Sequence, residues 1–404
     1  MSFTDPVRVS DEGQSAYTKG IAVGPSGTAT VAFEQIGPDG AAPVVAQIAP
    51  DGSVGPLTRL EAGVGRGPEV QVDADGVATV VWIAPAGGKG VIRYVRVAPD
   101  GTVGETREVP ATDPGWFLAT AIDDDGRVHI VWTESRGAHA TTVVEGELTA
   151  SGAFDSVRTV SDRKEEARWP GIAVDPSGRT WLAWDACPTN PDKWRCGIRT
   201  ATVSAAGRAS KDRLIFDPKN RNAYGVTDVS AGRLAIEKVH RRRHVRALFS
   251  RMSVQFVDLS DGREPAAKTL STWIGTYQTA GINPQIVTSS EGRSVLAWNN
   301  FHRIDAVRIG PEGHISAPFI LSDPDDRATG LELVMDGIDR TTVLWRGRHS
   351  VDLAKLDDRG RVVGTERVVG DNSDAAEPIV GVNDSGVTTV LWDEFGTVFA
   401  TVGQ

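Results

Sequence analysis

The sequence lacks long apolar runs and an excess of basic residues, and each absence excludes a class of partner. No stretch approaches the roughly 20 consecutive apolar residues of a membrane-spanning helix, so we expect no membrane partner. The net charge of −10 argues against a nucleic-acid partner, because such binding draws most of its affinity from Lys and Arg side chains on phosphates. The one basic run, His240 to His244, is interpreted as a solvated loop rather than a polyanion site.

Cysteine is nearly absent as well. The two cysteines, Cys187 and Cys196, lie in one short segment, CPTNPDKWRC, which allows either a disulfide or two reduced thiols. No histidine or further cysteine stands near them at a zinc-like spacing, so we expect no metal. Nor do we expect a cofactor.

The N-terminal residues, MSFTDPVRVSDEG, contain no basic segment followed by an apolar one. A secretory signal peptide would need both. We therefore expect a cytoplasmic protein if Met1 is the natural start, and a secreted protein if a signal peptide has been removed.

An eleven-residue unit recurs along the chain, clearest as VDPSGRTWLAW at 174–184. It contains an apolar run, a tight turn with a glycine, and a second apolar run that ends in an aromatic residue. The turn positions recur at intervals of roughly 50 residues, a period typical of propellers and solenoids. The eight anchors are Gly27, Gly76, Gly126, Gly178, Arg243, Gly292, Asp339 and Gly386.

Each period accommodates four short strands. In the second copy these are predicted at 68–73, 77–82, 91–98 and 103–109, separated by turn signals rich in Gly, Pro and Asp. Four strands with almost no helical periodicity predict one blade of a β-propeller. The fifth copy, VHRRRHVRALF at 239–249, has lost its glycine and its tryptophan.

The second strand of each copy is apolar on both faces, as expected for a strand pressed between neighbouring blades. Six residues after each anchor stands an aromatic residue, which we assign to packing between blades. These residues are Phe33, Trp82, Trp132, Trp184, Phe249, Trp298, Trp345 and Trp392.

The two ends of the chain complement each other. FTDPVRVSD at 3–11 matches the fourth strand of the sixth copy, and the last copy stops after its third strand. We therefore predict an all-β protein with a single domain over residues 1–404. The fold would be an eight-bladed β-propeller of four-stranded blades, in which the N-terminal strand completes the last blade and closes the ring.

The unit P-x-I-x-V-D-x-x-G followed by V-x-W, clearest at 170–184 and 378–392, resembles the propeller repeats of bacterial sialidase-like proteins. The resemblance covers nearly the whole chain and implies a propeller. Of the sialidase Asp box, S-x-D-x-G-x-T-W, only Gly178, Thr180 and Trp181 match, while Val174 and Pro176 replace the Ser and the Asp. Sialidase propellers also have six blades, so the resemblance does not imply sialidase activity.

Residues just past the aligned aromatics should line one face of a propeller, which we call the loop face. This face receives the connections from fourth to first strands and from second to third strands. The residues expected there are polar and mixed in charge. They include the carboxylates Glu134, Asp185, Asp393 and Glu394 and the arginines Arg136, Arg251 and Arg346.

Tryptophans outside the packing positions favour a ligand on this face. Trp116, Trp169 and Trp194 are expected in its loops, in adjacent blades that also supply Phe117 and Arg168. Tyr224 is expected on the same face, where it could serve a lyase as a base near an arginine. Exposed aromatic rings beside charged groups suit sugars, whose apolar faces stack while their hydroxyls form hydrogen bonds. They equally suit a protein partner, and the rings could also fold down and fill the loops.

Three functions follow as hypotheses. The leading one is a monomeric binding protein that recognises a carbohydrate or similar polar small molecule on the loop face over blades 3 to 5. The second is a glycan-cleaving hydrolase or lyase. A hydrolase would need two of the carboxylates Glu134, Asp185, Asp393 and Glu394 within roughly 10 Å of each other. The third is a scaffold for a protein partner.

Overall fold

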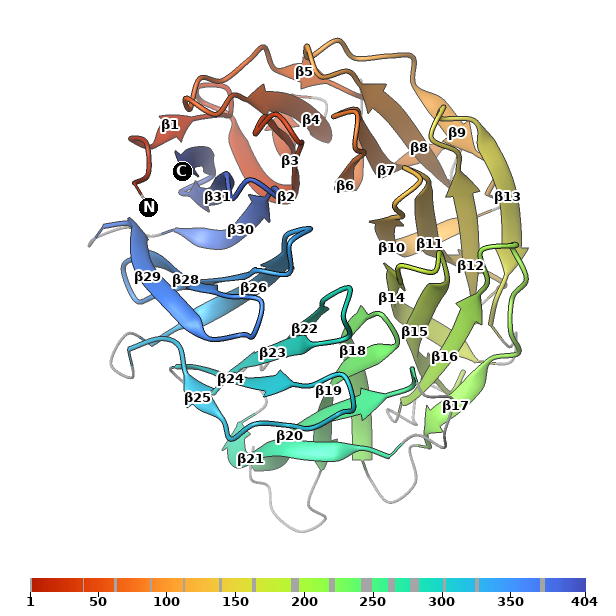
Figure 1. Ribbon diagram of the computed structural model, residues 1–404. Helices are drawn as coiled ribbons and strands as arrows, with labels where there is room; N and C mark the ends of the chain where they lie inside the picture. The colour runs from red at the N-terminus through yellow and green to blue at the C-terminus, as the bar shows by residue number, and fades with distance from the viewer. Residues whose placement is uncertain are drawn as a thin grey trace.

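The computed structural model describes residues 2–38, 40–61, 64–87, 89–111, 113–137, 140–161, 165–189, 196–217, 222–240, 249–260, 266–276, 283–300, 303–323, 327–370 and 375–404. Within these ranges the regular structure is entirely β, and the strands are arranged around a central axis (Figure 1). The described part contains no helix long and apolar enough to cross a membrane.

The described strands form six four-stranded sheets and one eight-stranded sheet, which contains β10 to β17. For reference we number successive sets of four strands as blades, and the eight-stranded sheet then contains blades 3 and 4. Blade 1 contains β2 (Ser15–Val23), β3 (Ala29–Gly37), β4 (Gly40–Ile48) and β5 (Thr58–Arg59), and blade 2 contains β6 (Arg66–Val72), β7 (Ala78–Ala86), β8 (Lys89–Val97) and β9 (Arg107–Val109). Blade 3 contains β10 (Pro114–Ile122), β11 (Val128–Ser135), β12 (Thr141–Leu148) and β13 (Phe154–Thr159), and blade 4 contains β14 (Glu166–Val174), β15 (Thr180–Cys187), β16 (Gly197–Val203) and β17 (Arg213–Phe216).

The second half of the chain repeats this plan. Blade 5 contains β18 (Asn222–Ser230), β19 (Arg233–His240), β20 (Phe249–Asp258) and β21 (Lys268–Thr276), and blade 6 contains β22 (Gln285–Thr288), β23 (Ser294–Asn299), β24 (Ile304–Ile309) and β25 (Phe319–Ile320). Blade 7 contains β26 (Thr329–Met335), β27 (Thr341–Arg346), β28 (Val351–Leu356) and β29 (Val362–Val369), and blade 8 contains β30 (Ala376–Val382), β31 (Thr388–Glu394), β32 (Thr397–Gly403) and the N-terminal β1 (Val7–Arg8).

The first strands of the blades contact one another in chain order. The order runs β2, β6, β10, β14, β18, β22, β26 and β30, and β30 in turn contacts β2. Side chains satisfy backbone groups of the neighbouring blade: Gln285 donates to the carbonyl of Leu331 at 2.9 Å and accepts from the N–H of Leu333 at 2.6 Å. Such bonds occupy polar groups at the inner strand edges that no ladder satisfies.

The N-terminal segment pairs with the C-terminal strand, as the match between the two ends predicted. Val7 and Arg8 lie antiparallel to Ala400 and Phe399, and Phe3 forms a bridge to Gly403. Val9 is 1% exposed and packs in one cluster with Val398 of blade 8.

The aligned tryptophans are buried between blades, which confirms their predicted role. Phe33 and the six tryptophans at this position are at most 3% exposed. Each packs against the preceding blade: Trp82 contacts the cluster of Ala32 and Val45 from blade 1, and Phe33 lies in a cluster with Leu391 of blade 8. Burial of one such ring stabilises the fold by a few kcal/mol, at about 25 cal/mol per Å² of apolar area.

Blade 5 differs from the sequence-based alignment. Its turn between the first and second strands is at Ala231 and Gly232, whose φ is +81°, because β18 and β19 form a hairpin around these two residues. The predicted anchor Arg243 lies outside the described residues, after the end of β19. Phe249 begins the third strand, not the second. The prediction that residues 239–249 contain the turn and second strand of this blade was therefore wrong. The true second strand is RLAIEKVH at 233–240, which lacks the continuous apolar run and final aromatic residue of the other copies.

At the boundary between blades 4 and 5, the large aromatic side chain comes from blade 4 and not from blade 5. Trp181, the tryptophan of the partial Asp box, is 8% exposed and clusters with Val229 and Ile236 of blade 5. Its indole N–H donates to Asp175 at 2.8 Å, and a Cβ on Gly232 would lie only 2.9 Å from its ring. Blade 5 thus lacks an aromatic second-strand residue, and Trp181 fills the space.

Candidate functional site

The first strands share an irregularity near the loop face. In blades 2, 4, 7 and 8 the first strand has a β-bulge, in which two residues face the buried tryptophan of the second strand. The first bulge residue has a left-handed φ in each blade. It is Gly67 (+56°), Trp169 (+50°), Gly330 (+59°) and Glu377 (+44°), respectively.

Trp169 is unusual at this position for two reasons. A left-handed φ costs an L-residue about 1–2 kcal/mol, and two sister blades avoid that cost with glycine. The side chain is also 60% exposed, so burial does not offset the strain. Strain of this kind persists at sites where function maintains it.

Phe117 of the neighbouring first strand, β10, supports the Trp169 ring. The two ring centroids are 4.1 Å apart at an interplanar angle of 49°. Such a tilted pair is an attractive aromatic contact. Together the two rings form an aromatic platform at the loop face, with one ring from blade 3 and one from blade 4.

Charged residues beside the platform are largely paired. Arg168 donates to Glu166 at 2.7 Å, and its backbone lies opposite Asp185 in the β14–β15 ladder. Glu134 is 4% exposed and accepts a hydrogen bond from the indole of Trp132 at 3.3 Å and one from Arg136 at 3.4 Å. Glu134 therefore anchors the packing tryptophan of its own blade.

On blade 8 the bulge residue is a carboxylate. Glu377 lies 3.8 Å from the ammonium group of Lys19 in blade 1. Burial and the negative charge of Glu377 raise the pKa of Asp393 to about 6, while Lys19 and Arg346 act in the opposite direction. Asp393 was predicted as a site residue; Glu377 and Lys19 were not, because no sequence signal marks the bulge.

Three further carboxylates on first strands were not predicted as site residues from the sequence. Burial raises the pKa of Glu69 to about 8, with a contribution from the charge of Glu332, and raises the pKa of Glu332 itself to about 7. Burial also raises the pKa of Asp228 to about 7, although it accepts hydrogen bonds from the N–H groups of Ile286 and Val229. An acidic residue within an otherwise apolar first strand, as in PEVQV, was the available signal.

Some predicted residues lie elsewhere than expected. Trp116 and Trp169 are in first strands rather than loops, Tyr224 is in β18 and Arg251 is in β20. The side chains of Trp116, Tyr224 and Arg251, and all of Trp194, lie outside the described residues. Glu394 ends β31 at the loop face. Cys187 and Cys196, which the sequence left undecided, form a disulfide.

A pocket of about 560 Å³ opens on the loop face between blades 2 and 3. Its wall includes Ile83 and Pro85 at the end of β7 and Pro114 and Gly115 at the start of β10, and Arg66 contributes charge. Gly115, one of the residues that line this pocket, lies two residues before Phe117 in β10. None of the predicted site residues lines it.

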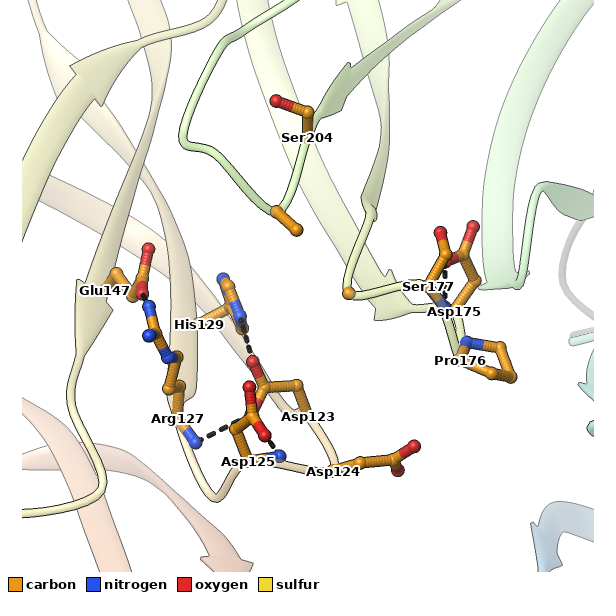
Figure 2. A pocket seen from close by; sticks show the side chains of 12 residues that line it. Asp123, Asp124, Asp125, Arg127, His129, Glu147, Asp175, Pro176, Ser177 and Ser204 are labelled. Atoms are coloured by element: carbon orange, nitrogen blue, oxygen red, sulfur yellow. Dashed lines mark hydrogen bonds and ion pairs between the residues drawn. The ribbon is translucent and has the colours of Figure 1, made fainter.

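A smaller pocket of about 210 Å³ lies on the opposite face, between the turns of blades 3 and 4 (Figure 2). Asp123 there closes its own turn, because one carboxylate oxygen accepts from the N–H groups of Asp125 and Arg127 at 3.0 and 2.8 Å. Within the described ranges, no group of three or more His, Cys, Asp or Glu residues could hold a metal ion.

His129 lines this second pocket and joins the two blades. Its ring lies 3.2 Å from Glu145 and 3.3 Å from the hydroxyl of Thr180 in blade 4, and Figure 2 shows it directed toward Asp123. Burial disfavours the charged ring, but the hydrogen bond to Glu145 and the charges of Glu145 and Glu147 together raise the pKa of His129. Arg158 pairs with Glu145 at 2.9 Å, so the network is charge-compensated.

Comparison with known proteins identifies the fold rather than a family. No protein-family model matches the chain, and no curated protein matches it. Among solved structures, an ulvan lyase bound to -[GlcA(1-4)Rha3S]- is similar, with a TM-score of 0.52 and 10% identity over 95% of its own chain and 97% of this one.

Prolyl oligopeptidase B from Galerina marginata is also similar, with a TM-score of 0.51 and 12% identity over 94% of this chain. This chain covers just over half of that enzyme, 55%. The β-propeller domain of the Trilobed protease from Pyrococcus furiosus matches with a TM-score of 0.47 and 8% identity. At these identities the similarities to the ulvan lyase and the prolyl oligopeptidase bear on the fold alone, and with the strand arrangement these two support a propeller-like all-β protein.

Proposed function

We propose that the chain is a single-domain, eight-bladed propeller, closed by its N-terminal strand, that binds a carbohydrate or similar polar ligand on the loop face over blades 3 to 5. The pairing of β1 with β32 and the contacts of successive first strands support the closed ring. Trp169 and Phe117 would form the centre of the ligand site.

The observation that carries this proposal is the combination of exposure and strain at Trp169. A ring that is 60% exposed on a left-handed backbone adds little to the stability of the fold. A flat aromatic surface gains energy only when something covers it. Sugar rings suit this surface, because their apolar faces stack on aromatics while hydroxyls bond to neighbouring polar groups.

Hydrogen-bonding groups lie in the same pair of strands as Trp169. Arg168 and Glu166 adjoin Trp169 on the same strand, and Asp185 lies opposite Arg168. The solved ulvan lyase, which has a similar fold, binds a polysaccharide, and that fact makes a glycan the first class to test.

The test compares two substitutions at left-handed positions, Trp169→Gly on the loop face and Ala231→Gly in the β18–β19 turn on the opposite face. Both relieve a left-handed backbone, but only the first removes the aromatic ring. Binding is measured to immobilised ulvan, pectin, alginate and β-glucan. We expect wild type and Ala231→Gly to bind one of these polymers, and Trp169→Gly to bind it at least tenfold more weakly. Equal binding by all three proteins would contradict the proposal.

A second candidate function is glycan cleavage. Asp393 favours it, because a pKa of about 6 keeps part of this carboxyl protonated near neutral pH, next to Glu377. A protonated and an ionised carboxyl group are the pair that hydrolases use as acid and base. Incubation of the same polymers with wild type and with Asp393→Asn tests it: new reducing ends with wild type alone would support cleavage, and none with wild type would exclude it for these polymers.

A further inference from the structure

We propose that the ligand is an extended polymer chain that crosses the channel mouth from Trp169 on blade 4 to Phe395 on blade 8. This inference rests on the proposed ligand site at Trp169. It adds a second aromatic contact and thereby restricts the substrate class to oligomers long enough to reach both.

Phe395 occupies the tip of the hairpin that joins β31 and β32. Glu394 and Thr397 pair with each other, so Phe395 and Gly396 form a two-residue turn. Their φ values are +50° and +75°. A turn with two left-handed residues favours Asn-Gly, because a bulky side chain at the first position is strained.

Phe395 is also the most exposed of the large apolar side chains in the described part, at 83%. Neither packing nor turn chemistry accounts for a phenylalanine there. Phe395 and Trp169 therefore share the same two properties, an exposed aromatic ring and a left-handed backbone, and both lie on the loop face.

The two residues lie on opposite sides of the channel. Along the contacts of first strands, β14 and β30 are separated by β18, β22 and β26 in one direction and by β10, β6 and β2 in the other. A monosaccharide could contact one of the rings but not both. A chain bound to both would pass over the channel mouth.

Polar groups stand near the Phe395 end of this path. Lys19 and Glu377 form their ion pair there, and Asp393 lies two residues before Phe395. Such groups can bond to the hydroxyls or acidic groups of a sugar chain. Aromatic rings at both ends of the path and polar groups at its Phe395 end suit an elongated, amphipathic ligand such as a polysaccharide.

The test is the dependence of affinity on oligomer length. Oligosaccharides from disaccharide to decasaccharide, prepared from the polymer that wild type binds, are titrated into wild type, Phe395→Asn and Trp169→Gly. Asn suits a left-handed turn position followed by Gly, so the Phe395→Asn variant should fold at least as stably as wild type, which a thermal melt verifies.

For wild type we expect affinity to rise with length beyond the shortest oligomers. Phe395→Asn should bind short oligomers as wild type does and lose at least tenfold in affinity for the longest, whereas Trp169→Gly should lose affinity at every length. Wild-type affinity that is independent of length, or unchanged binding of the decasaccharide by Phe395→Asn, would overturn this inference while leaving the site at Trp169 intact. If wild type binds none of the polymers tested, both proposals fail for this class of ligand.

Discussion

Trp169 and Glu377 occupy equivalent positions in opposite blades. Each is the first residue of a bulge that faces the buried tryptophan of the second strand, and their φ values are +50° and +44°. Glycine holds this position in blades 2 and 7, so the backbone does not require either side chain. The same structural feature therefore presents an aromatic ring in β14 and a carboxylate in β30.

Tryptophans in the two kinds of position should differ in their contribution to stability. We expect Trp169→Gly to leave the free energy of unfolding within about 1 kcal/mol of wild type, because relief of strain offsets the small loss of contact. Trp184→Ala, at a buried position, should cost about 3–5 kcal/mol. Chemical denaturation measures both values. A large loss with Trp169→Gly would mean that its ring is structural.

The carboxyl groups on the first strands should make stability fall as pH rises. The pKa of Glu69 is raised from 4.5 to about 8 in the folded protein, so the folded state retains a proton that the unfolded state releases above about 4.5. The contribution of protonated Glu69 to the free energy of unfolding is fully present below pH 4.5 and is lost as the pH rises from 4.5 to about 8. Glu69→Gln should therefore stabilise the protein by about 2 kcal/mol at pH 9 and little at pH 4.5. The same gain at both pH values would contradict this assignment.

His129 should give a smaller trend of the same sign on the opposite face. Its pKa is raised, so its contribution is fully present below about 6.5, the usual value, and is lost as pH rises through the folded pKa. The cost of His129→Gln should thus be larger at pH 5.5 than at pH 9. Denaturation curves of the two proteins at both pH values give the comparison. A cost that grows with pH would show that the ring is neutral in the folded state.

The disulfide between Cys187 and Cys196 should stabilise the loop after β15. The bond closes a short loop, with a sequence separation of 9, and the entropy of such a loop predicts a contribution of about 2–3 kcal/mol. Reduction, or replacement of both cysteines by serine, should lower the melting temperature accordingly. Alkylation with and without reductant reports whether the bond is formed in the purified protein.

Removal of residues 2–10 should destabilise the fold far more than an ordinary truncation. The deletion removes β1 and Val9, which is 1% exposed, and leaves one edge of β32 unpaired. We expect a loss of about 3 kcal/mol or more and a tendency to aggregate through the open edge. A variant with Val9→Ser alone separates loss of core packing from loss of strand pairing. An unchanged melting temperature after deletion would contradict closure by this strand.

The sequence alone predicted the period of roughly 50 residues, the turn glycines and the buried aromatics. Each of these features depends on local conformation or on a side chain that recurs from blade to blade. The same reasoning failed in blade 5. There Trp181 of blade 4 fills the interface across Gly232, and a contact between residues so far apart leaves no periodic signal.

The candidate site residues likewise include some that the sequence predicted and others that only the structure revealed. Position after the aligned tryptophans predicted that Asp393 would lie at the loop face, and the surplus of tryptophans singled out Trp169. Only the tertiary structure showed that Trp169 rests on Phe117, that Glu134 binds the indole of Trp132, and that Lys19 pairs with Glu377. The left-handed backbone of Trp169 and Phe395 could likewise not be predicted from the sequence, because the surrounding strands determine φ at a bulge or turn. The sequence alone thus determined the repeat and its packing, whereas the contacts between first strands that lie far apart in the sequence decided which polar and aromatic groups come together.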